Sequence, residues 1–184
     1  MKIACLAWGS LLWKPGALPL DSAWRAGGPP LPLEFTRVGD HGELSPALCV
    51  GVARQPTWWA LLAVADLPAA RERLRERERI DPDRPEWIGS LPGDPQQLFA
   101  VDIEAWRVEA GIDAVVWTAL PPRHQGEEGR MPTAEEAVAY LAGLEGKRRA
   151  HARDYIERMP PEFATPHRDA IEARLGWKPR AVPA

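Results

Sequence analysis

A glutamate on the apolar side of a predicted helix is the first residue whose position suggests chemistry. The segment PAARERLRERERI, at 68–80, follows Asp66, a residue type that often caps helices. At about 100° per residue, Ala70 and Leu74 share one face, and Glu78 falls on that face one turn later. Burial raises the pKa of a carboxyl group, and a carboxyl group that titrates near neutral pH can act as a general acid or base. Glu78 is therefore a candidate catalytic residue.

A structural explanation of Glu78 competes with the catalytic one. If the helix ends before residue 78, the side chain reaches water or pairs with Arg71 or Arg77. Glu72 and Glu76 lie on the opposite side of the helix and are expected to pair with nearby arginines on the surface.

The opening stretch IACLAWGSLLWKPG, at 3–16, places Gly9-Ser10 in the middle of an apolar run. A strand that breaks at such a pair leaves consecutive backbone N–H groups unpaired, and glycine lets a ligand approach the backbone closely. Such a loop can hold a carboxylate or polarise a carbonyl. The same pattern is also typical of a β-bulge or a turn.

The rest of the chain predicts strands in the first two thirds, with one internal helix, and helices in the last third. The predicted strands span 2–8, 33–38, 44–53, 58–66, 98–108 and 114–120. A turn is expected around Glu109-Ala110-Gly111, and loops are expected at 81–95 and 121–132, the second of them mobile. The predicted C-terminal helices are one capped by Thr133, one from about 145 to 159, and one from Thr165-Pro166 to Gly176.

Composition and charge narrow the class of protein. A chain of 184 residues, 45% hydrophobic, is long enough to bury a core, and we expect a single domain over 1–184. The formal net charge of −3 comes from mixed acidic and basic residues, which argues against a nucleic acid partner. Cys5 and Cys49 lie inside apolar runs and are expected to be reduced core residues. No segment is long and apolar enough to span a membrane, so we expect a cytoplasmic protein without a membrane partner.

Other catalytic chemistries fit the sequence less well. The residues around Ser10 do not form the GxSxG elbow of serine hydrolases. Cys49 and His41 are available as a nucleophile and a base, although a core thiol and a turn histidine explain them more simply. The four histidines show no ligand spacing, so no metal is expected, and the sequence has no nucleotide-binding glycine motif.

Three segments together resemble one enzyme family. WGSLLWKPG, at 8–16, is similar to the YGSL-W-PG segment of the ChaC-type γ-glutamylcyclotransferases, and R-E-R-I, at 77–80, resembles the R-E-x-V segment that carries that family's catalytic glutamate. Tyr155, in ARDYIERM, matches a tyrosine in a helical N-x-E-Y-L segment of the family. Trp8 stands where the family usually has tyrosine, which removes a hydroxyl group but keeps an aromatic wall.

The resemblance implies both a fold and a site. The fold would be a compact α+β domain whose mixed, β-barrel-like sheet is flanked by helices. Glu78 would be the catalytic carboxylate, and the substrate-binding residues would be Trp8, Gly9, Ser10, Leu11 and Tyr155. The reaction would close a γ-glutamyl group to 5-oxoproline and release an amine, with no metal or organic cofactor. The partner would be a small γ-glutamyl compound.

A second hypothesis keeps the fold but not the reaction. Trp8 and the very apolar opening stretch favour a non-catalytic member that binds an amino-acid-like ligand or a protein partner. A buried Glu78 with a raised pKa beside an open pocket would favour the enzyme, whereas an exposed, salt-bridged Glu78 or a pocket filled by Trp8 would favour the binding protein. The leaving group and the oligomeric state are not predicted, because they depend on loops that a single sequence does not define.

Overall fold

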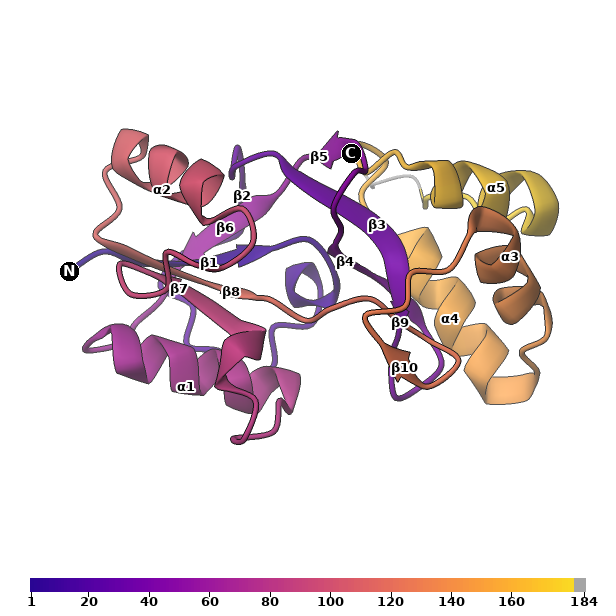
Figure 1. Cartoon of the computed structure of the whole chain (residues 1–184), viewed down its shortest axis with the longest axis horizontal. Coiled ribbons are helices and arrows are strands. Elements are labelled where there is room, and N and C mark those ends of the chain that lie inside the picture. The colour runs from indigo at the N-terminus through magenta and orange to yellow at the C-terminus, as the bar shows by residue number, and fades with distance from the viewer. Residues whose placement is uncertain (181–184) are drawn as a thin grey trace. The chain divides into compact units, whose positions relative to one another are not determined.

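The strands of the protein form two separate sheets, seen in a computed structural model that describes residues 1–180 (Figure 1). The chain divides into two compact units, one for each sheet. The first unit consists of Met1–Leu31 and Pro56–Leu120, and the second begins at Pro32–Gln55 and continues from Pro121. The chain is an α+β protein, as expected, and its strands pair both parallel and antiparallel.

The first sheet has β1, the strand predicted at the start of the chain, at its centre. β1 pairs antiparallel with β6 and parallel with β8. All five residues of β1 are buried, which is typical of a strand covered on both faces. In sheet order the strands are β2 (Arg25–Ala26), β6 (Trp58–Leu61), β1 (Ile3–Ala7), β8 (Ala114–Thr118) and β7 (Ile88–Leu91).

Helix α1, Leu67–Glu78, packs against this sheet through the predicted apolar face. The Asp66 carboxylate accepts a hydrogen bond from the backbone N–H of Ala69 at 2.8 Å, so the predicted N-cap is confirmed. Ala70 and Leu74 are fully buried in the same cluster as alternate residues of β1 and β8. Figure 1 shows α1 and the second helix of this unit, α2, on opposite sides of the sheet.

The strand predicted over 98–108 is wrong, because Ala100–Glu109 form helix α2. Ala100 and Ile103, three residues apart, are buried, whereas Val101 and Val108 are 82% and 63% exposed. Burial at this spacing fits a helix and not the alternation of a strand. The turn expected at 109–111 is instead the end of α2, so no hairpin forms there.

The edge strand β7 lies inside the segment 81–95, which was predicted to be a loop. All four of its residues are buried, and it pairs antiparallel with β8. A Cβ on Gly89 would lie 2.2 Å from the ring of Trp117, so the strand can pack here only because this residue has no side chain. A 3-10 turn, Pro85–Trp87, precedes β7.

The second unit contains the predicted strand pair and a short hairpin. β3 and β4 are antiparallel, and Asp40, His41 and Gly42 lie in the turn between them. The segment 121–132, expected to be a loop, contains the two-residue strands β9 and β10. The strands are β10 (Glu127–Glu128), β9 (Arg123–His124), β3 (Leu31–Val38) and β4 (Leu44–Leu48), with β5 (Arg54–Gln55) also paired to β3.

The three predicted C-terminal helices are confirmed. α3, Ala134–Ala142, begins with a capping box in which Thr133 and Glu136 bond each other's backbone N–H groups. α4 spans Gly146–Arg158. α5, Pro166–Leu175, is capped by the Thr165 hydroxyl and ends before Gly176.

No helix within residues 1–180 has both the length and the apolar character needed to cross a bilayer.

Both cysteines are buried and free, as predicted, and we expect both to be unreactive in the folded protein. Burial raises the pKa of the Cys5 thiol and of the Cys49 thiol. Since the thiolate is the reacting form, a raised pKa leaves little of it at pH 8. With Ellman's reagent at pH 8, both thiols should react within minutes in guanidinium chloride and neither on that timescale in the folded protein. Rapid release from one thiol of the folded protein would contradict this expectation.

Candidate functional site

The Gly9-Ser10 pair ends the central strand, and the chain then enters a single 3-10 turn, Ser10–Leu12. The Leu12 N–H donates to the carbonyl of Gly9 at 3.0 Å, which closes the turn. Among the described residues, the backbone N–H groups of Ser10 and Leu11 donate no hydrogen bond. The loop therefore presents two adjacent donors beside a half-buried glycine, as the sequence indicated.

Glu78 is the last residue of α1, and Arg79 follows it in the left-handed conformation that ends the helix. The helix therefore extends to residue 78, while the pairing with Arg77 that the structural explanation expected is present, with Nη1 3.3 Å from Oε1. The Glu78 side chain is only 18% exposed, whereas Glu72 and Glu76 are about half exposed and pair with Arg75 and Arg73. The glutamates thus divide between an inner and an outer face as the helical spacing predicted.

Arg77 connects Glu78 to the opening loop. Its Nη1 lies 3.3 Å from Oε1 of Glu78, and its Nη2 donates to Oγ of Ser10 at 3.4 Å. Its Nε donates to the carbonyls of Lys14 and Pro15 at 3.2 and 3.1 Å. One guanidinium therefore contacts both sequence segments that carried the resemblance.

Gly16 packs closely against the Arg77 side chain. A Cβ at this position would lie 3.1 Å from Cδ of Arg77, and the residue has φ +62°, a conformation that side chains disfavour. The Lys14-Pro15-Gly16 end of the opening stretch therefore contacts the Arg77 side chain, through two carbonyl groups and the close approach at Gly16.

The charges of Glu78 and Arg77 act on the thiol of Cys5 in the central strand. Burial is the main reason for the raised pKa of this thiol, and the negative charge of Glu78 raises it further, while Arg77 opposes the shift. Cys5 is fully buried on β1 and belongs to the core cluster that α1 covers. The charged pair at the end of α1 therefore lies close to the central strand.

The other predicted site residues have different surroundings. Trp8 and Leu11 are each 5% exposed, and Leu11 packs in the core cluster, so this residue can meet a ligand only through its backbone. Tyr155 lies in the second unit, on α4, and is 7% exposed. Its role at the site stays a prediction.

Sequence reasoning missed the linking role of Arg77. The residue stands in the R-E-R-I segment, but its position next to Glu78 suggested only an ion pair. Its other contacts join residues more than sixty positions apart, a separation over which sequence spacing carries no signal.

Within residues 1–180, no group of three histidine, cysteine, aspartate or glutamate side chains is arranged to hold a metal ion.

The fold and this site define an α+β protein with a glutamate-arginine pair at the end of a helix that covers a mixed sheet. Comparison of the chain with family models, curated proteins and solved structures finds no match. What the site can do must therefore be judged from its own residues and from the resemblance of its two segments.

Proposed function

We propose that the protein is a γ-glutamylcyclotransferase-like enzyme that converts a γ-glutamyl compound to 5-oxoproline and an amine. Glu78 is the general acid/base, and the loop of Gly9, Ser10 and Leu11 binds the γ-glutamyl group. The observation that carries the proposal is the contact of Arg77 with both Glu78 and Ser10. It joins, through one side chain, two segments that resemble the same family.

The proposed reaction needs little more than positioning and one proton carrier. Glu78 accepts a proton from the substrate's α-ammonium group, and the freed amine attacks the γ-carbonyl carbon of the same molecule. A new C–N bond closes the five-membered lactam, and the bond to the leaving nitrogen breaks. The two protons lost by the α-nitrogen end on the leaving amine, one of them returned by Glu78. Because the reacting groups share one molecule, holding them in the attacking geometry supplies much of the acceleration.

The unpaired N–H groups of Ser10 and Leu11 support the binding half of the proposal. Two adjacent backbone donors can bind the substrate's carboxylate or the oxygen that becomes negative during attack. The low exposure of the Glu78 side chain, 18%, supports the catalytic half, whereas its ion pair with Arg77 favours the second candidate described below.

A panel of γ-glutamyl compounds tests the proposal. Purified protein is incubated with glutathione, with γ-glutamyl amino acids and with γ-glutamylamines, and released 5-oxoproline is measured by chromatography. We expect turnover of at least one class, and the class turned over identifies the leaving group. Folded protein that turns over none of them would contradict the proposal.

A second candidate, ligand binding without turnover, is favoured by the burial of Trp8 in place of a tyrosine. In that case 5-oxoproline or a γ-glutamyl compound would raise the melting temperature without being consumed. Measuring the melting temperature on the same panel separates the two candidates.

A further inference from the structure

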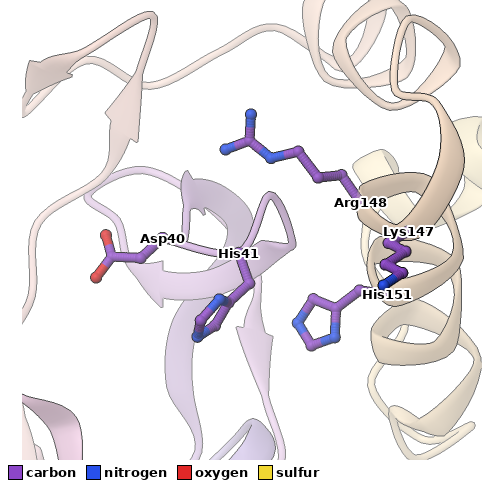
Figure 2. Close-up of a pocket in the computed structure, with 5 residues that line it drawn as sticks. All are labelled: Asp40, His41, Lys147, Arg148 and His151. Carbon is purple, nitrogen blue, oxygen red and sulfur yellow. The ribbon is translucent and has the colours of Figure 1, made fainter.

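The second unit contains a pocket that the proposed reaction does not use. It has a volume of about 320 Å³ and lies between the β3–β4 turn and the first turns of α4 (Figure 2). This is roughly ten times the volume that one water molecule occupies in the liquid, and within the range of small-molecule sites. Its lining residues are Asp40, His41, Lys147, Arg148 and His151.

Basic side chains dominate the α4 side of the pocket. The rings of His41 and His151 lie edge to face, with an interplanar angle of 80° and their centroids 5.8 Å apart (Figure 2). Within residues 1–180, Lys147 and Arg148 form no ion pair or hydrogen bond through their side chains. His151 has an acidic neighbour in Glu43, whose Oε2 lies 3.4 Å from Nε2 of His151.

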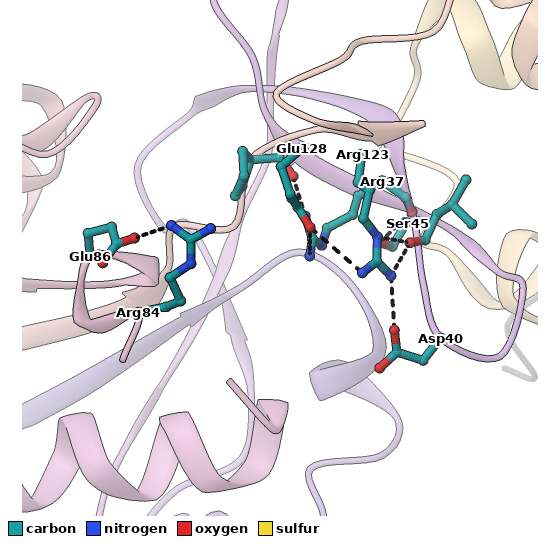
Figure 3. Close-up of polar contacts among 9 residues, drawn as sticks. Arg37, Asp40, Ser45, Arg84, Glu86, Arg123 and Glu128 are labelled. Carbon is teal, nitrogen blue, oxygen red and sulfur yellow. Dashed lines mark hydrogen bonds and ion pairs between the residues drawn. The ribbon is translucent and has the colours of Figure 1, made fainter. Parts of the chain in front are cut away.

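Asp40, the acidic residue of the lining, is already paired elsewhere. Its carboxylate accepts a hydrogen bond from Arg123 at 2.9 Å, which lowers the pKa of Asp40 (Figure 3). Arg123 and Arg37 also contact Glu128, so these two arginines and two acids balance in charge. In Figure 2 the Asp40 carboxylate points away from His151. The positive charges of Lys147 and Arg148 are therefore not compensated from this side.

The placement of these charges is unfavourable for the helix itself. Lys147 and Arg148 are four and three residues before His151, so all three share one face of α4. The first turn of α4 contains no acidic residue, whereas the first turns of α3 and α5 do, and the side chain of Glu145, the acidic N-cap of α4, makes no capping hydrogen bond. Basic groups near a helix N-terminus oppose the helix dipole. A bound anion would reduce both the repulsion among these basic groups and their unfavourable interaction with the helix dipole.

We propose that this pocket, the His41–His151 pocket, binds the phosphate group of a small molecule. A phosphate monoester carries nearly two negative charges at pH 7, which matches the two uncompensated cations. The planar guanidinium of Arg148 can donate to two phosphate oxygens at once, and imidazole N–H groups supply further donors. The pocket is larger than one phosphate group, so it has room for part of the molecule that carries it.

Titration of isotope-labelled protein tests the proposal. Amide resonances of residues 40–42 and 147–151 are followed by NMR while inorganic phosphate or glycerol phosphate is added at constant ionic strength. We expect saturable shifts of these resonances with at least one of the two compounds. Saturation by inorganic phosphate alone assigns the pocket to the free ion, and tighter binding of glycerol phosphate assigns it to a phosphorylated metabolite.

Charge-removing variants give the control. Lys147→Gln combined with Arg148→Gln should weaken binding by at least about tenfold, because two charge-assisted contacts are lost. Arg174→Gln removes one positive charge, half the change of the double variant, from a position on α5 outside the pocket, and should change the affinity by less than about twofold. Three results would overturn the proposal: no saturation with either compound, the same shifts with sodium chloride, or equal weakening by Arg174→Gln.

Discussion

Replacing Glu78 by glutamine is expected to abolish the release of 5-oxoproline while leaving the protein folded. Glutamine keeps the size of the side chain and a hydrogen-bond acceptor for Arg77, but it cannot carry a proton from the attacking nitrogen to the leaving one. Loss of a general acid/base lowers turnover by about 10²- to 10⁴-fold. The measurement is the rate of 5-oxoproline release at saturating substrate, using the compound that the panel identifies.

The same helix offers a matched control. Glu76 is two residues earlier, about half exposed, and paired with Arg73 at 3.0 Å. Glu76→Gln removes the same charge from the outer face and should leave the turnover within about twofold, since exposed ion pairs contribute little. If Glu78→Gln retains full turnover, or if the two variants lose it equally, Glu78 is not the proton carrier.

Replacing Arg168 by methionine is expected to give the largest loss of stability. Arg168 is 2% exposed in the second unit, and burial lowers the pKa of its guanidinium, an effect that Glu172 opposes. Its guanidinium donates to the carbonyls of Met159, Pro160 and Phe163, and to the Glu172 carboxylate. These hydrogen bonds connect α5 to residues 159–163, the segment that follows α4.

Methionine fills similar space but leaves three carbonyls and a carboxylate without these donors. Each unpaired buried group costs about 1–3 kcal/mol, and breaking a buried charged network typically costs about 3–5 kcal/mol. We therefore expect the free energy of unfolding, measured by urea denaturation, to fall by about 3 kcal/mol or more. Arg174→Met, at an exposed position of the same helix, should change it by less than about 0.5 kcal/mol. A loss below about 1 kcal/mol for Arg168→Met would show that the network is dispensable.

Elements with local signals were predicted from the sequence. Asp66 caps α1 and Thr133 caps α3, because a side-chain oxygen one position before a helix satisfies its first free N–H groups. The division of Glu78 from Glu76 followed from the helical period alone, which depends on backbone geometry and not on the partner.

Elements whose local sequence signal was weak or misleading were not predicted correctly. The segment 98–108 is rich in residues that favour strands, yet it forms α2, where Val101 and Val108 remain exposed. β7 contains a glycine and a serine, which are typical of loops, yet it is a buried edge strand because Gly89 admits the ring of Trp117. In both cases packing against the rest of the unit outweighed the preference of the segment.

The sequence by itself determined the central strand, the helix that carries Glu78 and the break at Gly9-Ser10, because each depends on residues within a few positions of one another. Only the tertiary structure decided that Arg77 contacts both Glu78 and Ser10, and that His41 and His151 meet edge to face in the lining of one pocket. Contacts of this kind join residues separated by tens of positions. Their formation depends on how whole elements pack, and that packing reflects buried area summed over many side chains, which no short motif records.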